Sequence, residues 1–252
     1  MILKEFSLEG KVAVVAGAGR SWLKALASFL AEAGADVALA GQDQKQMEEA
    51  AQEVKNLGRQ AIVMPTDVTS YQQIEEMAAA VTSQWEKIDI LVNSMDLQFA
   101  KPLLEVTEEE WHRVIATNLT AVFLCTKAVG KHMMERKEGK VITITSVLAE
   151  RGLSNSTAYC ASKGGVGQFT KALALEWARQ NIRVNAIGVG WISEEAEGEE
   201  GEPKDPLVRY IPLRRLCRPD DLGALLVYLA SDASSYVTGQ TYFVSGGVMA
   251  HG

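Results

Sequence analysis

Tyr159 and Lys163 are the first pair of side chains in the sequence that could move a proton. They stand four residues apart at the start of a predicted helix, so both are expected on one face of it. A phenol has an unperturbed pKa of about 10, and a neighbouring ammonium group favours the phenolate. The spacing therefore indicates a general acid/base, although a tyrosine and a lysine at this distance also occur by chance.

Ser146 and Asn118 are two further polar residues in mainly apolar surroundings. Ser146 directly follows the apolar run 141–145, a predicted strand, and the carboxyl ends of strands in a doubly wound sheet face the ligand site. Its hydroxyl is therefore a candidate donor toward a ligand. Asn118 lies among apolar neighbours in a helix predicted over 107–134, which Thr107 and Glu110 open as a capping box. By itself Asn118 is typical of a helix-surface amide.

The first predicted strand, 12–16, runs into a turn that contains glycines and reads Gly17-Ala18-Gly19-Arg20-Ser21-Trp22-Leu23. A glycine-rich turn before a helix can hold a pyrophosphate, because bare backbone lets the phosphate approach the amides at the start of the helix. Only half of that pattern is present, since Trp22 or Leu23 stands where close packing of helix on strand requires a small residue. Two interpretations stay open, a phosphate cradle and a plain strand-to-helix turn.

The elements that must position these residues alternate along the chain. Short runs rich in Val and Ile predict strands at 12–16, 37–40, 61–64, 88–92, 141–145, 182–187 and 241–244, and amphipathic helical stretches lie between them. Strands that are apolar on both faces indicate a parallel sheet covered by helices on both sides. We predict an α/β fold, a doubly wound, Rossmann-like, seven-stranded parallel sheet in a single domain, 1–252. The irregular and acidic stretch 191–212 is predicted to be a solvated loop, a lid over the site, or both.

Composition and charge exclude several classes of function. The 252 residues include 25 basic and 32 acidic ones, and the net charge of −7 argues against nucleic-acid binding. The cysteines and histidines are scattered, so we expect neither a disulfide framework nor a metal site. We find no apolar run long enough to span a membrane, and the N-terminus is too polar for a signal peptide. A cytoplasmic protein with no membrane partner is therefore expected.

Taken together, these residues resemble the short-chain dehydrogenase/reductase family over essentially the whole chain. Asn118, Ser146, Tyr159 and Lys163 occur in the order and at the spacing typical of that family. Further segments that look like the family are Asp67-Val68-Thr69, Asn93, Arg183-Val184-Asn185, Thr238-Gly239-Gln240 and Gly246-Gly247. The resemblance implies an enzyme that transfers hydride between NAD(P)(H) and a carbonyl/alcohol pair.

The resemblance also implies a role for each site residue. Tyr159 would exchange a proton with the substrate oxygen, and Ser146 would hydrogen-bond that oxygen. Lys163 would lower the pKa of Tyr159 and bind the nicotinamide ribose, and Asn118 would hold a water that links Lys163 to solvent. The residues implied in cofactor binding are Gly17, Arg20, Ser21, Trp22, Asp67, Val68, Asn93, Tyr159, Lys163, Gly190 and Ile192.

The sequence departs from the family on the cofactor side. Ser21 and Leu23 replace glycines of the turn, Asn93-Ser94-Met95-Asp96 replaces Asn-Asn-Ala-Gly, and Glu194 aligns with a cofactor-binding threonine. Leu23 would displace the helix or the strand, while Asp96 and Glu194 would add negative charge near a pyrophosphate. Three interpretations follow: a working oxidoreductase with an unusual turn, an enzyme that no longer uses a redox cofactor, or a binding protein on the same fold.

Indications of the dinucleotide, the substrate and the assembly are weaker. The second strand ends in Ala40-Gly41-Gln42, without a carboxylate for a ribose 2′-hydroxyl, and Arg20 could pair with a 2′-phosphate, which favours NADP over NAD. The acidic loop would repel anions, which favours a neutral ketone or alcohol as the small-molecule substrate. The resemblance implies a homo-oligomer, a tetramer or a dimer.

Overall fold

Seven parallel strands form one sheet with the order β3-β2-β1-β4-β5-β6-β7 in a computed structural model of the chain. It describes residues 3–19, 22–192 and 206–250. The strands are β1 (Val12–Gly19), β2 (Asp36–Gly41), β3 (Ala61–Pro65), β4 (Ile90–Asp96), β5 (Gly139–Ser146), β6 (Ile182–Val189) and β7 (Thr241–Val244). This arrangement confirms the predicted doubly wound α/β fold.

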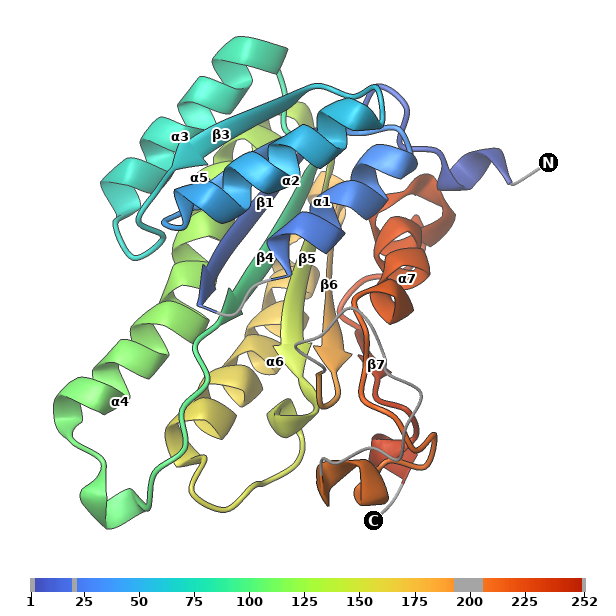
Figure 1. The fold of residues 1–252 in the computed structure, drawn as a ribbon. Helices are drawn as coiled ribbons and strands as arrows, with labels where there is room; N and C mark the ends of the chain where they lie inside the picture. Colours follow the sequence, from blue (N-terminus) through green and yellow to red (C-terminus); the bar gives the residue numbers. More distant parts are fainter. Residues whose placement is uncertain (1–2, 20–21, 193–205, 251–252) are drawn as a thin grey trace.

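Helices cover both faces of the sheet (Figure 1). They are α1 (Leu23–Glu32), α2 (Gln44–Asn56), α3 (Tyr71–Trp85), α4 (Glu108–Ile115), α5 (Ala121–Arg136), α6 (Thr157–Trp177) and α7 (Asp220–Ala230). Side chains of successive strand residues point to opposite faces, so β1 contributes Val14 to one core and Val15 to the other. The first core lies under α3, α5 and α6, and the second under α1, α2 and α7.

Strands β1 and β4 extend further than the sequence predicts. The glycine-containing turn starts as strand, because Gly17, Ala18 and Gly19 pair with the three residues that end β4. Gly19 has a φ of +69°, and a Cβ there would lie 2.4 Å from the main-chain oxygen of Asp96, so only glycine fits. The first half of the turn therefore closes against β4.

The helix predicted over 107–134 is confirmed as a continuous helical stretch with one irregular turn. Thr107 and Glu110 form the expected capping box at its start. A π-helical turn, Ala116–Thr120, joins α4 to α5 and carries the buried Asn118. The stretch Glu108–Arg136 is long and apolar enough by composition to cross a membrane, but 50% of its apolar window is buried inside the protein, as in a core helix.

Candidate active site

The carboxyl ends of β4, β5 and β6 and the first turns of α6 border a cavity of about 440 Å³. This is where a doubly wound sheet binds ligands, and the volume is typical of small-molecule sites. Its wall combines apolar side chains with a few polar ones. The described residues that line it include Trp22, Ser94, Met95, Asp96, Phe99, Ser146, Leu148, Tyr159, Lys163, Gly190, Trp191 and Ile192.

Three of the four predicted catalytic residues lie together on this wall. Helix α6 presents Tyr159 and Lys163 on one face, and the Lys163 Nζ lies 5.4 Å from the centre of the Tyr159 ring. Lys163 is 1% exposed, and its Nζ donates to the main-chain oxygen of Met95 at 2.7 Å. Ser146 ends β5 beside them, and its Oγ accepts a hydrogen bond from Leu148 N at 3.2 Å. The structure thus gives the expected phenol, ammonium and hydroxyl a common cavity.

A carboxylate that sequence analysis did not place among the catalytic groups completes the cluster. The Tyr159 hydroxyl donates to Asp96 Oδ1 at 2.6 Å, and the Lys163 Nζ lies 2.9 Å from the same oxygen. From the sequence we expected Asp96 only to repel a pyrophosphate. The signal that could have found it was the replacement of a glycine by an acid at the end of β4, next to the predicted site.

The environment of Tyr159 reverses the expected direction of its pKa shift. Burial raises the pKa of the phenol well above its ordinary value, and the charge and hydrogen bond of Asp96 raise it further. A hydrogen bond with Ser146 acts in the opposite direction but is a smaller effect. The expected lowering of the Tyr159 pKa is therefore wrong for this arrangement, because burial and Asp96 outweigh the opposite effect of Ser146.

Asn118 is buried and braces the chain that leaves β4. Its Oδ1 accepts from Leu97 N at 2.7 Å, and its Nδ2 donates to Leu97 O at 3.0 Å and to Ser162 Oγ at 3.2 Å. The helix-surface interpretation of Asn118 is therefore wrong. No contact between its side chain and Lys163 is found among the described residues, so the water relay stays a prediction.

The residues predicted to bind the cofactor separate into several groups. Trp22, Gly190 and Ile192 line the same cavity as Tyr159 and Lys163. Gly17 borders a second space of about 220 Å³, together with Gly41, Gln42 and Asp43. Arg20, Ser21 and Glu194 lie outside the described residues, as does most of the loop 191–212.

Three other predicted cofactor residues line neither of these two spaces. Asn93 is fully buried, and its Nδ2 donates to Thr126 Oγ1 at 3.1 Å, so its side chain holds β4 to α5, and a role in cofactor binding stays a prediction. Val68 packs in the core, and the Asp67 carboxylate accepts from the backbone of Thr69. Neither residue lines the two spaces described above.

The residues present fit a dinucleotide with one exception. The larger cavity offers an ammonium and hydroxyls beside apolar walls, and the smaller one is bordered by bare glycine backbone. Leu23 is accommodated as the first residue of α1, where its side chain is 2% exposed in the core. The exception is Asp96, whose carboxylate already accepts from the Tyr159 hydroxyl and pairs with the Lys163 ammonium. Among the described residues we find no cluster of potential metal ligands.

Comparison with known proteins gives the same assignment. Residues 17–249 match a family model described as enoyl-(acyl carrier protein) reductase. The 2-dehydro-3-deoxy-D-gluconate 5-dehydrogenase of Pseudoalteromonas atlantica is 38% identical over 98% of this chain and 99% of its own. The 5-keto-D-gluconate 5-reductase of Escherichia coli is 37% identical over 97% of both chains.

Solved structures resemble this chain in fold as well as in sequence. The crystal structure of a gluconate 5-dehydrogenase from Burkholderia cenocepacia, in complex with NADP and tartrate, matches with a TM-score of 0.91 and 32% identity over 100% of both chains. The prediction of an NAD(P)-dependent oxidoreductase for a carbonyl/alcohol pair is confirmed by these relatives, and the two alternatives without redox chemistry are not favoured. On this evidence the chain belongs to the short-chain dehydrogenase/reductase family.

Proposed function

We propose that the 440 Å³ cavity is the active site of an NADP-preferring oxidoreductase for a small neutral ketone or alcohol. The observation that carries this proposal is the convergence of Tyr159, Ser146 and Lys163 on one wall of the cavity, at the carboxyl edge of the sheet. A phenol that exchanges a proton, a hydroxyl that orients an oxygen and an ammonium beside them are the groups that carbonyl reduction requires.

Each side chain has one task in the proposed reaction. The bound dinucleotide supplies or accepts the hydride. In reduction, Tyr159 donates its proton to the substrate oxygen, and Ser146 Oγ donates a hydrogen bond to the same oxygen. Lys163, held by the Met95 carbonyl, binds the ribose hydroxyls and offsets the negative charge left on the phenol. Asn118 keeps its predicted place in a proton relay. In oxidation, the same groups act in reverse.

The charges around the cavity support a neutral substrate. Among its described lining residues Lys163 is the only cation, and it is paired with Asp96 at 2.9 Å. A substrate carboxylate would find no unpaired positive charge there, and it would lie close to the partly buried Asp96. The relatives named above carry the names of gluconate enzymes, so we infer a different charge preference at this site. Comparing kcat/KM for a neutral ketone and for a keto acid of equal size tests this preference, and faster turnover of the acid would contradict it.

The end of β2 supports NADP over NAD. Gly41 and Gln42 border the 220 Å³ space without a carboxylate on either residue. The nearest acid, Asp43, caps α2 by accepting from Gln46 N at 3.0 Å, so its Oδ1 is engaged. The strand end itself therefore offers no carboxylate to a ribose 2′-hydroxyl, and the nearest one is partly engaged in capping α2, which weakens the usual advantage of NAD.

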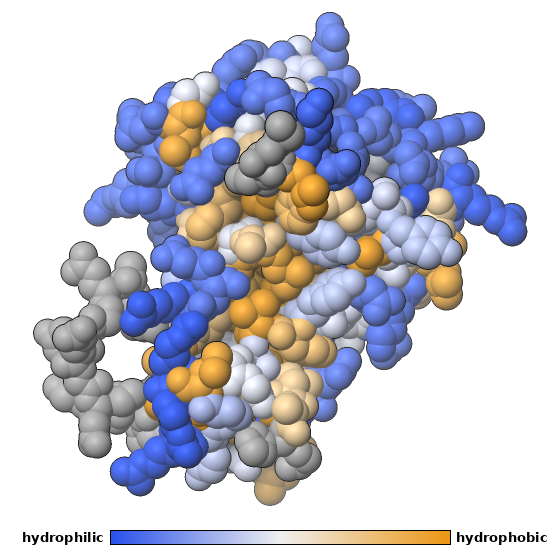
Figure 2. All heavy atoms as spheres, turned by 90° about the vertical axis from the view of Figure 1, so that its right-hand side faces the viewer, coloured by the Kyte–Doolittle hydropathy of each residue, from blue (hydrophilic) through white to orange (hydrophobic). Residues whose placement is uncertain are grey.

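We infer a homo-oligomer in the cytoplasm. Figure 2 shows the side that carries α7 and β7, where apolar side chains extend down the middle of the face between polar margins. Tyr210 and Leu213 in the segment between β6 and α7 are among the exposed large hydrophobic residues, and such patches favour association. All three cysteines are free, as is usual in a reducing compartment. Light scattering tests the assembly, and a monomer at micromolar concentration would contradict it.

Titration with NADPH and NADH, followed by calorimetry, tests the proposed function first. We expect NADPH to bind more tightly, and tenfold tighter NADH would overturn the preference. The second step is Tyr159→Phe, which removes the proton donor but keeps the ring. We expect turnover to fall by about 10²–10⁴-fold with the fold intact, because that is the typical contribution of general acid/base catalysis. Unchanged turnover would remove Tyr159 from the reaction.

A further inference from the structure

Asp96 is a charged group at the cavity for which the proposed reaction has no use. Among the described residues that line the cavity it is the only carboxylate, and its side chain is 13% exposed. One of its oxygens accepts the hydrogen of Tyr159 at 2.6 Å and pairs with Lys163 at 2.9 Å. A single side chain thus engages both groups that the reaction needs.

Tyr159 cannot serve the reaction and Asp96 at the same time, and Lys163 has only one donor left while it is paired with Asp96. A phenol carries one hydrogen, so Tyr159 cannot donate to Asp96 and to a substrate oxygen together. Lys163 has three donors, of which the Met95 carbonyl takes one and Asp96 takes another. If Lys163 binds the ribose hydroxyls, as in the proposed function, the dinucleotide competes with Asp96 for the Lys163 ammonium.

The main chain on both sides of this carboxylate is held in place. On one side, Asn118 bonds both the N–H and the oxygen of Leu97, the next residue along the chain. On the other side, β1 packs so closely that a Cβ on Gly19 would lie 2.4 Å from the main-chain oxygen of Asp96. Because the backbone is held at these two points, rotation of the Asp96 side chain is the simplest movement that frees Tyr159 and Lys163.

We propose that Asp96 is a positioning residue that competes with the dinucleotide and the substrate for Lys163 and Tyr159. Binding is coupled to rotation of this side chain away from both groups. This inference rests on the proposed function, since it takes Lys163 as the ribose-binding group. Its consequence is quantitative: the apparent affinity for the dinucleotide is the intrinsic affinity multiplied by the fraction of molecules in which Asp96 has released Lys163.

The experiment compares NADPH binding by four proteins. These are the wild type, Asp96→Gly, Asp96→Asn and the matched control Glu150→Gln, which also removes one negative charge but from an exposed loop residue that does not line the cavity. Dissociation constants are measured by calorimetry and by quenching of tryptophan fluorescence, because Trp22 and Trp191 line the cavity. Thermal melting confirms that each variant is folded.

We expect Asp96→Gly to bind NADPH about tenfold more tightly than the wild type, as follows if Asp96 holds Lys163 in about nine molecules of ten. Asp96→Asn gains less, because its amide oxygen still accepts from Tyr159 although it has no charge to pair with Lys163. Glu150→Gln matches the wild type. Once a substrate is known, we also expect Asp96→Gly to lower the KM for NADPH.

The outcomes separate this inference from the proposed function. If the wild type binds NADPH and folded Asp96→Gly binds it equally or more weakly, Asp96 is a spectator or a ligand and the inference is wrong, while the proposed function stands. If no protein of the set binds either dinucleotide, the proposed cofactor use fails and the inference fails with it. Should Asp96→Gly not fold, the nearly isosteric Asp96→Asn decides, and an affinity equal to that of the control contradicts the proposal.

Discussion

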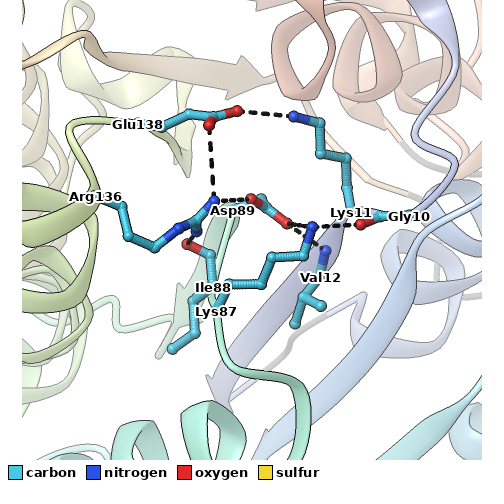
Figure 3. Close-up of polar contacts among 8 residues, drawn as sticks. All are labelled: Gly10, Lys11, Val12, Lys87, Ile88, Asp89, Arg136 and Glu138. Carbon is cyan, nitrogen blue, oxygen red and sulfur yellow. Dashed lines mark hydrogen bonds and ion pairs between the residues drawn. The ribbon is translucent and has the colours of Figure 1, made fainter.

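Strand β4 has an aspartate at each end, and the two have different consequences. Asp89, directly before the strand, is 2% exposed, and it accepts from Val12 N at 2.8 Å and from Arg136 at 2.9 Å. The Lys87 Nζ lies 3.2 Å from Asp89 Oδ2, so two cations offset one carboxylate (Figure 3). Asp96, the last residue of β4, has one cation and a phenol as partners.

The difference between the two aspartates follows from the edge of the sheet at which each lies. The space next to Asp89 measures about 70 Å³, whereas Asp96 borders about 440 Å³. In parallel sheets the carboxyl edge is where ligands bind. A buried charge at the amino edge therefore ties β1, β4 and α5 together, while the same charge at the carboxyl edge changes the proton chemistry of the site. The location of a carboxylate in the fold, more than its type, decides its role.

The largest expected effect separates the two aspartates by stability. Asp89→Ala leaves the Val12 amide without its acceptor and takes the buried carboxylate from Arg136 and Lys87, which keep only main-chain oxygens and the more distant Glu138 as partners. We expect it to lower the free energy of unfolding by about 2–3 kcal/mol. This is below the cost for a fully buried pair, because the side chains of Arg136 and Lys87 are 29% and 32% exposed. Urea unfolding at fixed protein concentration measures the loss.

The same measurement on Asp96→Ala provides the comparison. Water in the cavity can solvate Lys163 when the carboxylate is gone, so we expect a loss of no more than about 1 kcal/mol. Glu138→Gln, at the partly exposed pair with Lys11 near Asp89, controls for removal of any charge at the amino edge and should also cost less than about 1 kcal/mol. Equal losses of stability in Asp89→Ala and Asp96→Ala would contradict the conclusion that the first aspartate is structural and the second acts on the chemistry of the site.

A smaller effect is expected at Asn118, next to the carboxyl end of β4. Asn118→Ala removes both hydrogen bonds to Leu97, and we expect it to cost about 1–2 kcal/mol of stability. It also loosens the backbone that holds Asp96, so NADPH binding should become tighter, by less than in Asp96→Gly.

Asn185→Ala is the matched control for this effect. Asn185 is a buried amide that also bridges two backbone groups, Val237 O and Gln240 N, and it does not line the cavity. Its loss should cost similar stability and leave NADPH affinity unchanged. If the two variants change the affinity alike, Asn118 does not act through Asp96.

The smallest effect concerns the amino edge, where burial lowers the pKa of Lys140 to about 8 from its ordinary 10.5. Between these values the unfolded chain binds more protons than the folded one, so the cost of Lys140 to stability is full below pH 8 and disappears as the pH rises toward 10.5. Lys140→Met should therefore raise stability at pH 7 by less than about 1 kcal/mol, because the side chain is only partly buried. Its advantage should shrink steadily as the pH rises from 8 toward 10.5, and an advantage that stays constant over this range would contradict the assignment.

Much of the fold could be predicted because its signals are local. Val- and Ile-rich runs between amphipathic stretches indicated the seven strands, and helical spacing paired Tyr159 with Lys163. The ends of β1 and β4 were missed because Gly17 and Gly19 are typical of a turn, and only their pairing with β4 makes them strand. The partners of the Asn93 side chain could not be predicted, because they lie in α5 and β5, far from it in the sequence.

By itself, the sequence determined the α/β alternation and the type of polar residue that ends each strand, since these depend on periodicity and on neighbours close in the chain. Only the tertiary structure decided which carboxylate meets the phenol. Asp96 and Tyr159 are separated by 63 residues, and their 2.6 Å contact depends on how β1, the π-turn and α6 pack around the end of β4. A hydrogen bond is lost within a few tenths of an ångström, so the packing of distant elements sets the direction of the Tyr159 pKa shift.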